Sequence, residues 1–399
     1  MSDPWREFSA RAPGEEFAGY FEANAGLPGE SGRATWYVGD PEIRTITARS
    51  SPEEEGRASA RFLQNHRDRA VIGYLGFDAV GIFEPTLRRV PAGSPFPLGE
   101  FAYAEGVRRA RVPRRTGSPR RSPLGTPHAP VSDSLPRPAY QQAVRRLVEE
   151  IRNGESYQVV LAHRRTWKRP AELVSAAGRL RRDERFAFFY YLKFGDREIL
   201  GASPESVVEV ARERAYLNPI AGTIPRGRGR ARRRPLTVDP KELSEHRMLV
   251  DLARNDLGAV ARPGTVRLLS VEQVERYARL DHLVTHVGAR LKPGIGPWDV
   301  LGSAFPAGTV SGAPKIRATE LLRREERSWR GPYAGTVGLL DAPDRAQWAL
   351  AIRTAFAARN RVYTAAGAGI VHRSEPAREF EETLTKLAQV EATIAGGAP

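Results

Sequence analysis

Cysteine is absent from the 399 residues, and only two methionines are present. The absence of cysteine excludes disulfide bonds, thiolate metal sites and cysteine nucleophiles. It also excludes, within this chain, any glutaminase whose mechanism requires a catalytic cysteine. Thiol chemistry therefore has no part in the function of this chain.

Long apolar runs are absent as well. The most apolar stretch, residues 186–192, is as long as a strand and far too short to cross a bilayer. Residues 1–7 have no apolar core behind a basic start, so no signal peptide is expected. The composition, 41% apolar and 27% charged, is that of an ordinary folded protein. We therefore expect a cytoplasmic enzyme or binding protein that has no membrane partner.

Acidic residues are in the minority, with 47 against 62 lysines and arginines and a formal net charge of +15. Much of the excess lies in two arginine clusters, which are Arg108, Arg109, Arg111, Arg114, Arg115, Arg120 and Arg121, and then Arg226, Arg228, Arg230, Arg232, Arg233 and Arg234. Such clusters could contact nucleic acid, but no recognition motif accompanies them. Solvated loops, an anionic substrate or an acidic partner surface explain them more simply, so no nucleic-acid partner is expected.

Neither an internal repeat nor a Walker-type phosphate loop is present. Strand and helix patterns mix without strict alternation, which predicts an α+β fold with large, mostly antiparallel sheets flanked by helices. We expect a strand-rich N-terminal subdomain at 1–111, a Pro/Arg-rich linker or loop at 112–136, and a catalytic domain at 137–396.

Helices are predicted at 140–153, 240–257, 279–291, 313–327 and 376–394. The first has Ala143, Leu147 and Ile151 at four-residue spacing, with Gly154 in position to end it. Strands are predicted at 156–163, 186–193, 198–202, 334–340, 347–356 and 361–370.

Two Glu-x-x-Glu pairs, Glu242/Glu245 and Glu379/Glu382, lie in predicted helices. Residues three apart share one helix face, so each pair can direct two carboxylates at one site. Mg²⁺ prefers oxygen ligands and often uses one or two carboxylates together with water. Such a pair more often lies on a solvated helix face, so only the flanking sequence can indicate whether these glutamates bind a metal.

The flanking sequence is rich in glycine at 308–315, 331–335 and 367–371. Glycines allow backbone N–H groups to approach an anion closely. Arg353, in a predicted strand, could hold a carboxylate in a bidentate fork, and Lys386 lies one helical turn beyond Glu382. These groups suit a small anionic metabolite, although Gly312 to Lys315 also has the form of a helix start with proline in its first turn.

These motifs resemble those of the chorismate-utilising enzymes, and most closely those of the large subunit (component I) of anthranilate synthase. The resemblance runs from about residue 30 to residue 390, with the motifs in the order of the family. The matching segments are 73–80, 154–160, 202–205, 219–223, 245–258, 305–315 and 379–386, together with Tyr333 and Arg353.

The resemblance implies a Mg²⁺ ion on the ring carboxylate of chorismate, held by Glu245 and Glu382 with support from Glu242 and Glu379. Glu205 would be the general acid that protonates the departing C4 hydroxyl, and His282 would serve the aromatising elimination. A core or helix-capping role is the alternative for His282. The implied substrate-binding residues are Gly222, Thr223, Thr309, Tyr333, Arg353, Gly367, Ala368, Gly369 and Lys386, with Arg353 on the enolpyruvyl carboxylate.

Two positions distinguish the branches of this family. Relatives that add water at C2 have a lysine base where this chain has Gln158, and a neutral amide cannot deprotonate water. Relatives that make aminodeoxychorismate often have lysine where this chain has Ala221. The sequence therefore favours addition of ammonia at C2, with anthranilate and pyruvate as products. The ammonia would come from solution or from a separate glutamine amidotransferase subunit.

Some positions depart from the family pattern. The tryptophan-sensing Leu-Leu-Glu-Ser stretch of the family is replaced by residues 20–23, Tyr-Phe-Glu-Ala, and the usual acidic residue is missing near 347–349. The lost serine counts against feedback inhibition by tryptophan, although tryptophan biosynthesis stays an expected role. The changes suggest a pathway-specific relative in secondary metabolism, and they also suit an enzyme that stops at 2-amino-2-deoxyisochorismate. The sequence is also compatible with an aminodeoxychorismate synthase component I, with a non-catalytic chorismate-binding partner and with a basic nucleic-acid-binding protein. Both homo-oligomers and hetero-oligomers are compatible with it.

Overall fold

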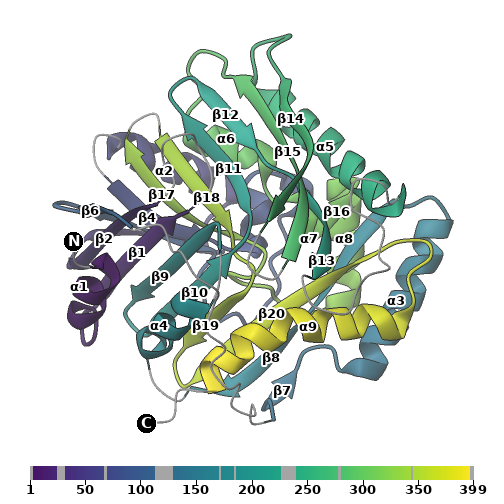
Figure 1. The fold of residues 1–399 in the computed structure, drawn as a ribbon, viewed down its shortest axis with the longest axis horizontal. Coiled ribbons are helices and arrows are strands. Elements are labelled where there is room, and N and C mark those ends of the chain that lie inside the picture. The colour runs from purple at the N-terminus through teal and green to yellow at the C-terminus, as the bar shows by residue number, and fades with distance from the viewer. Residues whose placement is uncertain are drawn as a thin grey trace.

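The computed structural model describes residues 3–24, 32–66, 70–112, 129–169, 172–183, 186–225, 240–276, 280–342 and 345–395. These residues form two ten-stranded sheets, and every strand pairing within them is antiparallel. The prediction of large antiparallel sheets flanked by helices is confirmed (Figure 1).

We call the two sheets A and B. Sheet A has the order β16-β8-β20-β19-β10-β9-β1-β2-β6, with β7 paired to β8. Its strands are β1 (Phe17–Ala23), β2 (Arg33–Gly39), β6 (Arg108–Arg111), β7 (Ser132–Asp133), β8 (Gln158–Lys168), β9 (Phe188–Phe194), β10 (Arg197–Ser203), β16 (Gly312–Ala313), β19 (Thr354–Ala358) and β20 (Arg361–Ile370).

Sheet B has the order β13-β15-β12-β11-β18-β17-β4-β5-β3, with β14 paired to β15. Its strands are β3 (Glu42–Ile46), β4 (Ala70–Leu75), β5 (Gly99–Ala104), β11 (Ser206–Ala211), β12 (Arg214–Leu217), β13 (Ile220–Pro225), β14 (Arg267–Arg276), β15 (Leu280–Arg290), β17 (Thr336–Ala342) and β18 (Arg345–Leu350).

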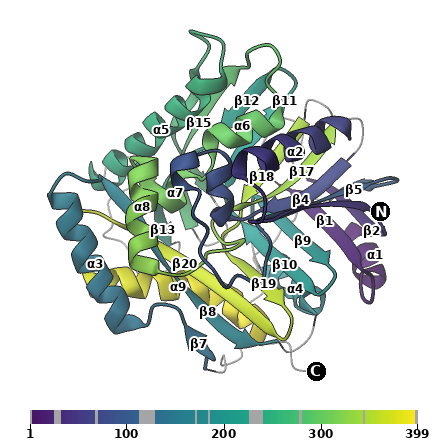
Figure 2. The same cartoon turned by 180° about the vertical axis from the view of Figure 1, so that it is seen from behind.

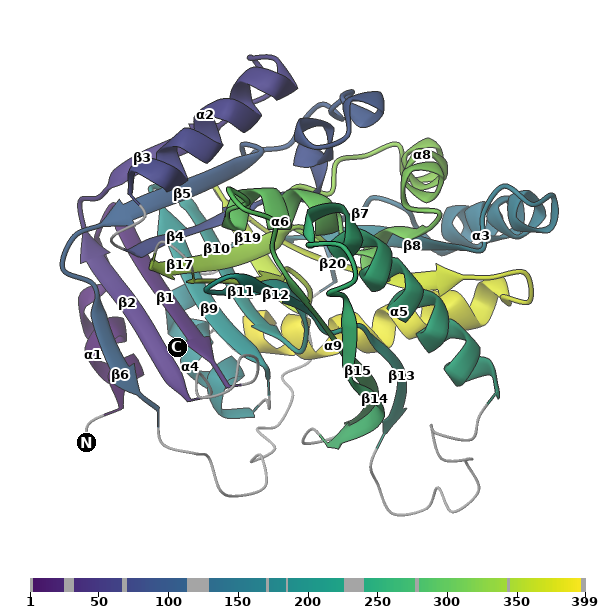
Figure 3. The ribbon, with the colours of Figure 1, turned by 90° about the horizontal axis from the view of Figure 1, so that it is seen from above.

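Helices cover both sheets, as Figures 2 and 3 show from behind and from above. The helices are α1 (Pro4–Arg11), α2 (Pro52–Asn65), α3 (Arg137–Arg152), α4 (Leu173–Asp183), α5 (Pro240–Val260), α6 (Pro297–Ala304), α7 (Gly308–Ser311), α8 (Lys315–Glu326) and α9 (Pro376–Ala395), with short 3-10 turns at Phe77–Ile82 and Pro85–Leu87. Helices α1, α4 and α9 pack on sheet A, and α2, α5 and α6 pack on sheet B. Within the described residues, no helix is long and apolar enough to cross a membrane.

The two sheets share one hydrophobic core. Phe17 and Phe21 of β1 belong to this core together with Ile72 of β4 in sheet B. Tyr20, on the opposite face of β1, belongs to a second cluster with Trp5 of α1. Successive side chains of a strand point to opposite faces, so β1 is buried throughout because both of its faces are covered.

The helix predictions at 140–153, 240–257, 313–327 and 376–394 are confirmed by α3, α5, α8 and α9. The helix predicted at 279–291 is wrong, because those residues form the strand β15. The apolar spacing of Leu280, Leu283, Val284 and Val287 matched a helix, but β15 has β12, β13 and β14 as pairing partners. Tertiary strand pairing therefore overrides the local periodicity.

The single strand predicted at 347–356 is two strands in two different sheets. Strand β18 ends at Leu350 in sheet B, and β19 begins at Thr354 in sheet A. Arg353 lies between them with φ of 50°, a left-handed conformation that does not continue a strand. An apolar run in the sequence cannot reveal that the chain changes sheets within it.

Strands from both sides of segment 112–136 are present in each sheet, and residues 113–128 of that segment lie outside the described residues. The second arginine cluster, 226–234, lies outside them too. In the first cluster, Arg108 pairs with Glu7 and Arg109 pairs with Asp341. These described arginines are thus engaged with acidic groups of the same chain.

A glycine-to-alanine pair tests the packing of sheet B. A Cβ on Gly338 of β17 would overlap the ring of Trp348, whereas a Cβ on Gly258 of α5 would meet nothing within 4 Å. We expect Gly338→Ala to lower the free energy of unfolding by about 1–3 kcal/mol, since Trp348 is fully buried and has to move. Gly258→Ala should leave it unchanged or raise it by up to about 1 kcal/mol. Urea unfolding measures both, and equal midpoints for the two variants would contradict the packing.

Candidate active site

The site lies where the chain crosses twice between the two sheets. Glu205 is in the connection from β10 in sheet A to β11 in sheet B, and Arg353 is in the connection from β18 in sheet B to β19 in sheet A. The N–H of Leu350 donates to the carbonyl of Glu205 at 2.9 Å, and the N–H of Ala202 donates to that of Arg353 at 3.3 Å. These bonds hold the two crossings side by side.

Glu205 is the most perturbed acid of this region. Its residue is 8% exposed, and its carboxylate Oε1 accepts a hydrogen bond from the hydroxyl of Thr309 at 2.7 Å. Burial raises the pKa of Glu205 to about 7, against the Thr309 hydrogen bond and the charges of Arg353 and Lys386, which lower it. The carboxyl can therefore be neutral near pH 7 and act as a proton donor.

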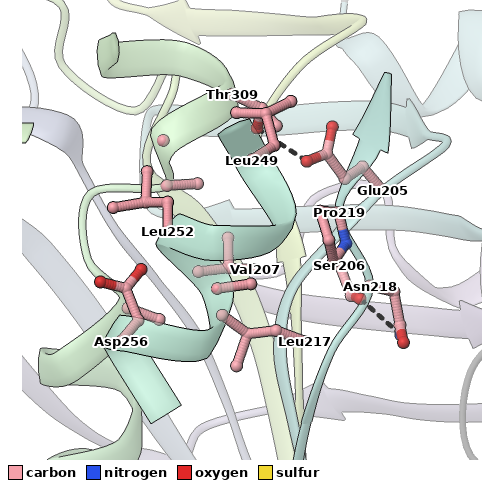
Figure 4. A pocket seen from close by; sticks show the side chains of 14 residues that line it. Glu205, Ser206, Val207, Leu217, Asn218, Pro219, Leu249, Leu252, Asp256 and Thr309 are labelled. Atoms are coloured by element: carbon pink, nitrogen blue, oxygen red, sulfur yellow. Dashed lines mark hydrogen bonds between the residues drawn. The ribbon is translucent and has the colours of Figure 1, made fainter. Parts of the chain in front are cut away.

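A small pocket reaches Glu205 and Thr309 from the side of α5. It encloses about 370 Å³ of empty space, part of it open to solvent, between β11, α5 and α7. Figure 4 shows Glu205 and Thr309 joined by their hydrogen bond, with Leu249 and Leu252 of α5 beside them. The pocket gives the acid a largely apolar surrounding on this side.

Strand β20 supplies the glycine-lined part of the site. A Cβ on Gly367 would lie 3.0 Å from Val160 and 3.2 Å from the hydroxyl of Tyr333, and a Cβ on Gly369 would overlap the amide of Gln158. A side chain at position 367 would require Val160 and Tyr333 to shift slightly, and one at position 369 would displace the amide of Gln158. The predicted residues Tyr333 and Gln158 are therefore brought to the same strand, although they come from different parts of the chain.

Tyr333 and Lys386 both contact the backbone of Gly367. Tyr333 is 3% exposed, and burial raises its pKa, opposed by the charge of Arg330 and by a hydrogen bond with the backbone of Gly367. The ammonium of Lys386 donates to the carbonyl of Gly367 at 2.8 Å. Lys386 thus links α9 to β20, and Ala368 between the two glycines is fully buried.

The predicted metal-binding carboxylates lie on α5 and α9. The charges of Glu379 and Glu382 act on buried Tyr140, whose pKa is raised first by burial and then by them. Glu382 also pairs with Lys386 at 2.8 Å. Glu245 lies half-buried on α5, whereas the side chain of Glu242 falls outside the described part of the structure.

The first turns of α5 and α9 lie on the same side of the molecule in Figures 1 and 3. Among the described side chains, no group of three or more potential metal ligands comes together. One or two carboxylates with water suffice for Mg²⁺, so the oxygen donors of the two helices fit this ion by their chemistry.

Four other predicted residues are placed by their backbone alone. Ala221, Gly222 and Thr223 are in β13 and His282 is in β15, and their side chains are outside what the structure describes. In the strand register, Thr223 is opposite His282, and Ala221 is opposite Leu283. The predicted substrate-binding threonine and the predicted elimination histidine are thus cross-strand neighbours.

Sequence reasoning missed Arg330, a buried arginine that supports the site. Its guanidinium donates to the carbonyls of Val310 and Val160 at 2.7 Å each and pairs with Glu326 at 2.6 Å. The carboxylate of Asp78 accepts from the N–H groups of residues 330 and 331. Burial raises the pKa of Asp78 to about 6, although these hydrogen bonds and the nearby arginines lower it. The i,i+4 spacing of Glu326 and Arg330 was the one signal in the sequence that could have suggested this pair.

Through these bonds Arg330 joins α7, which carries Thr309, to strand β8, which carries Gln158. Its guanidinium also lies 4.4 Å from the ring of Phe77 and 5.8 Å from that of Tyr333. One buried cation therefore sets the relative position of several site residues.

Comparison with known proteins bears on what this site binds. Residues 26–392 match the family described as chorismate binding enzyme. Anthranilate synthase component 1 of Saccharolobus solfataricus is 36% identical over 337 residues, which cover 81% of this chain and 80% of that protein. A 2-amino-4-deoxychorismate synthase of Streptomyces globisporus is 39% identical over 275 residues, which cover 68% of this chain but only 56% of that protein.

A solved structure agrees with the fold. The crystal structure of anthranilate synthase component I from Streptococcus pneumoniae TIGR4 superposes with a TM-score of 0.72 at 28% sequence identity. The superposition covers 95% of this chain and 91% of that chain. The two-sheet arrangement is thus shared along nearly the whole length of both proteins.

The hydrogen bond from Thr309 has a measurable effect on Glu205. We expect Thr309→Val to raise the pKa of Glu205 above about 7, because it removes a donor that stabilises the charged carboxylate. Infrared titration of the carboxylic acid C=O band measures this, with Glu205→Gln identifying the band. Thr319→Val on α8, whose hydroxyl donates to a helix carbonyl instead, is the matched control. An unchanged or lowered midpoint in Thr309→Val would contradict the assigned bond.

Proposed function

Because this chain belongs to the chorismate binding enzyme family, and is thus an enzyme that acts on chorismate, we propose that it is a Mg²⁺-dependent aminating chorismate lyase. Ammonia adds at C2 of the ring, the C4 hydroxyl leaves as water, and loss of the enolpyruvyl side chain as pyruvate gives anthranilate. The balance is one chorismate and one ammonia to one anthranilate, one pyruvate and one water.

The observation that carries this proposal is the buried carboxyl of Glu205. A hydroxyl leaves far more readily as water than as hydroxide, so the C4 oxygen needs a proton as its bond breaks. Burial keeps the carboxyl of Glu205 neutral up to about pH 7, and Thr309 fixes the position of one of its oxygens. Glu205 can therefore supply that proton under neutral conditions.

Cationic and glycine-lined groups suit the two carboxylates of chorismate. Arg353 lies in the crossing beside Glu205, and its charge acts on the Glu205 carboxyl. We assign Arg353 to the enolpyruvyl carboxylate, which it can hold in a bidentate fork. Tyr333 and the backbone of Gly367 and Gly369 would line the ring, and Lys386 would hold α9 against it.

Gln158 supports ammonia as the nucleophile that attacks C2. Its amide lies against Gly369 in the glycine-lined part of the site. An amide has no basic group that could deprotonate water, whereas ammonia is nucleophilic without a base. Ala221, which lacks a nucleophile, favours addition at C2 over formation of 4-amino-4-deoxychorismate.

Glu245 and Glu382, supported by Glu242 and Glu379, would hold the Mg²⁺ ion. The ion would neutralise the ring carboxylate of chorismate and withdraw electron density from the ring. The salt bridge between Lys386 and Glu382 links this group of carboxylates to the carbonyl of Gly367.

We assign the loss of pyruvate to His282, and we expect the ammonia to come from a separate glutamine amidotransferase, because this chain has no cysteine. The similarity to a 2-amino-4-deoxychorismate synthase favours one second candidate, an enzyme that performs the amination without loss of pyruvate. The two candidates differ only in the final elimination, so their products distinguish them.

Product analysis tests the proposal. The pure protein incubated with chorismate, Mg²⁺ and ammonium salt at alkaline pH should release fluorescent anthranilate and an equal amount of pyruvate. A product that is aminated at C2 and retains the enolpyruvyl group would support the second candidate. The formation of 4-amino-4-deoxychorismate or of isochorismate, or no turnover, would contradict the proposal, and a reaction without ammonium is the control.

The pH dependence tests Glu205 as the acid. The neutral carboxyl is the active form, so the enzyme should lose activity as the pH rises through about 7. The quantity to measure is kcat/KM for ammonia, calculated with the concentration of free NH₃ at each pH. Thr309→Val should move this fall to higher pH, because it raises the pKa of Glu205. Glu205→Gln should lower kcat by about 100- to 10,000-fold while chorismate still binds. A Gln variant with wild-type kcat would exclude Glu205 as the acid.

A further inference from the structure

A buried histidine, His163 of β8, connects three elements close to the site. It is 2% exposed, and its ring nitrogen Nδ1 lies 2.9 Å from both carboxylate oxygens of Asp133 in β7. Its other nitrogen, Nε2, lies 2.8 Å from the hydroxyl oxygen of Thr383 in α9. Neither Asp133 nor His163 belongs to the acid, substrate-binding and metal-binding residues of the site.

The contacts of Thr383 carry this link into the backbone of α9. Its hydroxyl also donates to the carbonyl of Phe380 at 2.7 Å, so the side chain bridges His163 and the helix. On the other side of the ring, an ionised carboxylate can only accept, so Nδ1 donates to Asp133. The histidine is therefore held at both of its ring nitrogens.

The environment of Asp133 supports its ionised form. Burial raises its pKa, but the hydrogen bond and charge of His163, the N–H of Leu135 and the charge of Arg165 outweigh burial and hold the pKa below its usual value. The backbone N–H of Leu135 donates to the carboxylate at 3.0 Å. A proton on Asp133 that points at Nδ1 is thus disfavoured.

Arg165 adds a second link between β7 and α9, because it faces a carboxylate of each. Arg165 lies 3.4 Å from Asp133 and 3.2 Å from Glu391 of α9. The remaining close neighbours of the imidazole are the rings of Tyr140 and Phe380, at 5.5 and 5.2 Å.

This cluster lies directly beside the site. Thr383 follows Glu382 in the chain, and Lys386 is three residues further along the same helix. In the register of β8 with β20, His163 is opposite Ala366, the residue before Gly367. A bond from His163 to Thr383 therefore fixes the distance of α9 from the glycine-lined strand.

We propose that His163 is a positioning residue, a buried ring that clamps α9 to β8 and thereby holds Glu382 and Lys386 against Gly367. The kinetic consequence rests on the proposed function, whereas the clamp does not. A cluster that only stabilised the fold would affect unfolding and leave the saturation of the site by its ligands unchanged.

Binding and kinetics test the clamp. Thr383→Val removes the acceptor of Nε2, Thr383→Ser retains it, and His286→Gln on β15 replaces a half-buried histidine that is bonded to Asn218 instead. In Thr383→Val and His163→Gln, we expect the Mg²⁺ dissociation constant from calorimetry and the KM for chorismate to rise about 10- to 100-fold. The Ser variant and the His286 variant should stay within about twofold of wild type.

The remaining outcomes are decisive as well. If Thr383→Val is folded and both constants stay within about twofold of wild type, the clamp does not position the site and the proposal fails. If His163→Gln does not fold, Thr383→Val, which preserves side-chain size, still decides. If the wild type makes no anthranilate, the proposed function fails, and the Mg²⁺ dissociation constants still test the clamp.

Discussion

The geometry of this protein depends on two chain crossings between its sheets that are hydrogen-bonded to each other. The crossing from β10 to β11 carries Glu205, and the crossing from β18 to β19 carries Arg353. Backbone bonds from Leu350 and Ala202 hold them together. Because both crossings are anchored at each end in ten-stranded sheets, the acid and the cation are fixed by the fold rather than by a loop.

Buried charge completes this arrangement. Arg330, paired with Glu326, ties the helix of Thr309 to β8, and the cluster of His163 and Asp133 ties α9 to the same strand. Removing one member of a buried ion pair leaves an uncompensated charge, which is costly, so such pairs hold one geometry firmly. Strand β8 therefore serves as the common reference for the acid, the glycine-lined strand and the helix of Glu382.

Much of this site could be predicted from the sequence, and the failures have a clear cause. Helices α3, α5, α8 and α9 follow from local periodicity, since each buries one apolar stripe. The spacing of Leu283, Val284 and Val287 predicted a helix, yet these residues form β15 because three neighbouring strands pair with it. Local patterns do not encode such distant partners, and the division of 347–356 between two sheets was hidden for the same reason.

The sequence by itself determined the types of residues available for chemistry. It specified an acid at Glu205, an amide instead of a base at Gln158, carboxylate pairs at helical spacing, and no thiol. Only the tertiary structure decided which of these groups meet and in what state of charge. The pKa of Glu205 near 7 and the two bonds of His163 arise from burial and from partners far away in the chain, and both exist only once the sheets have closed over them.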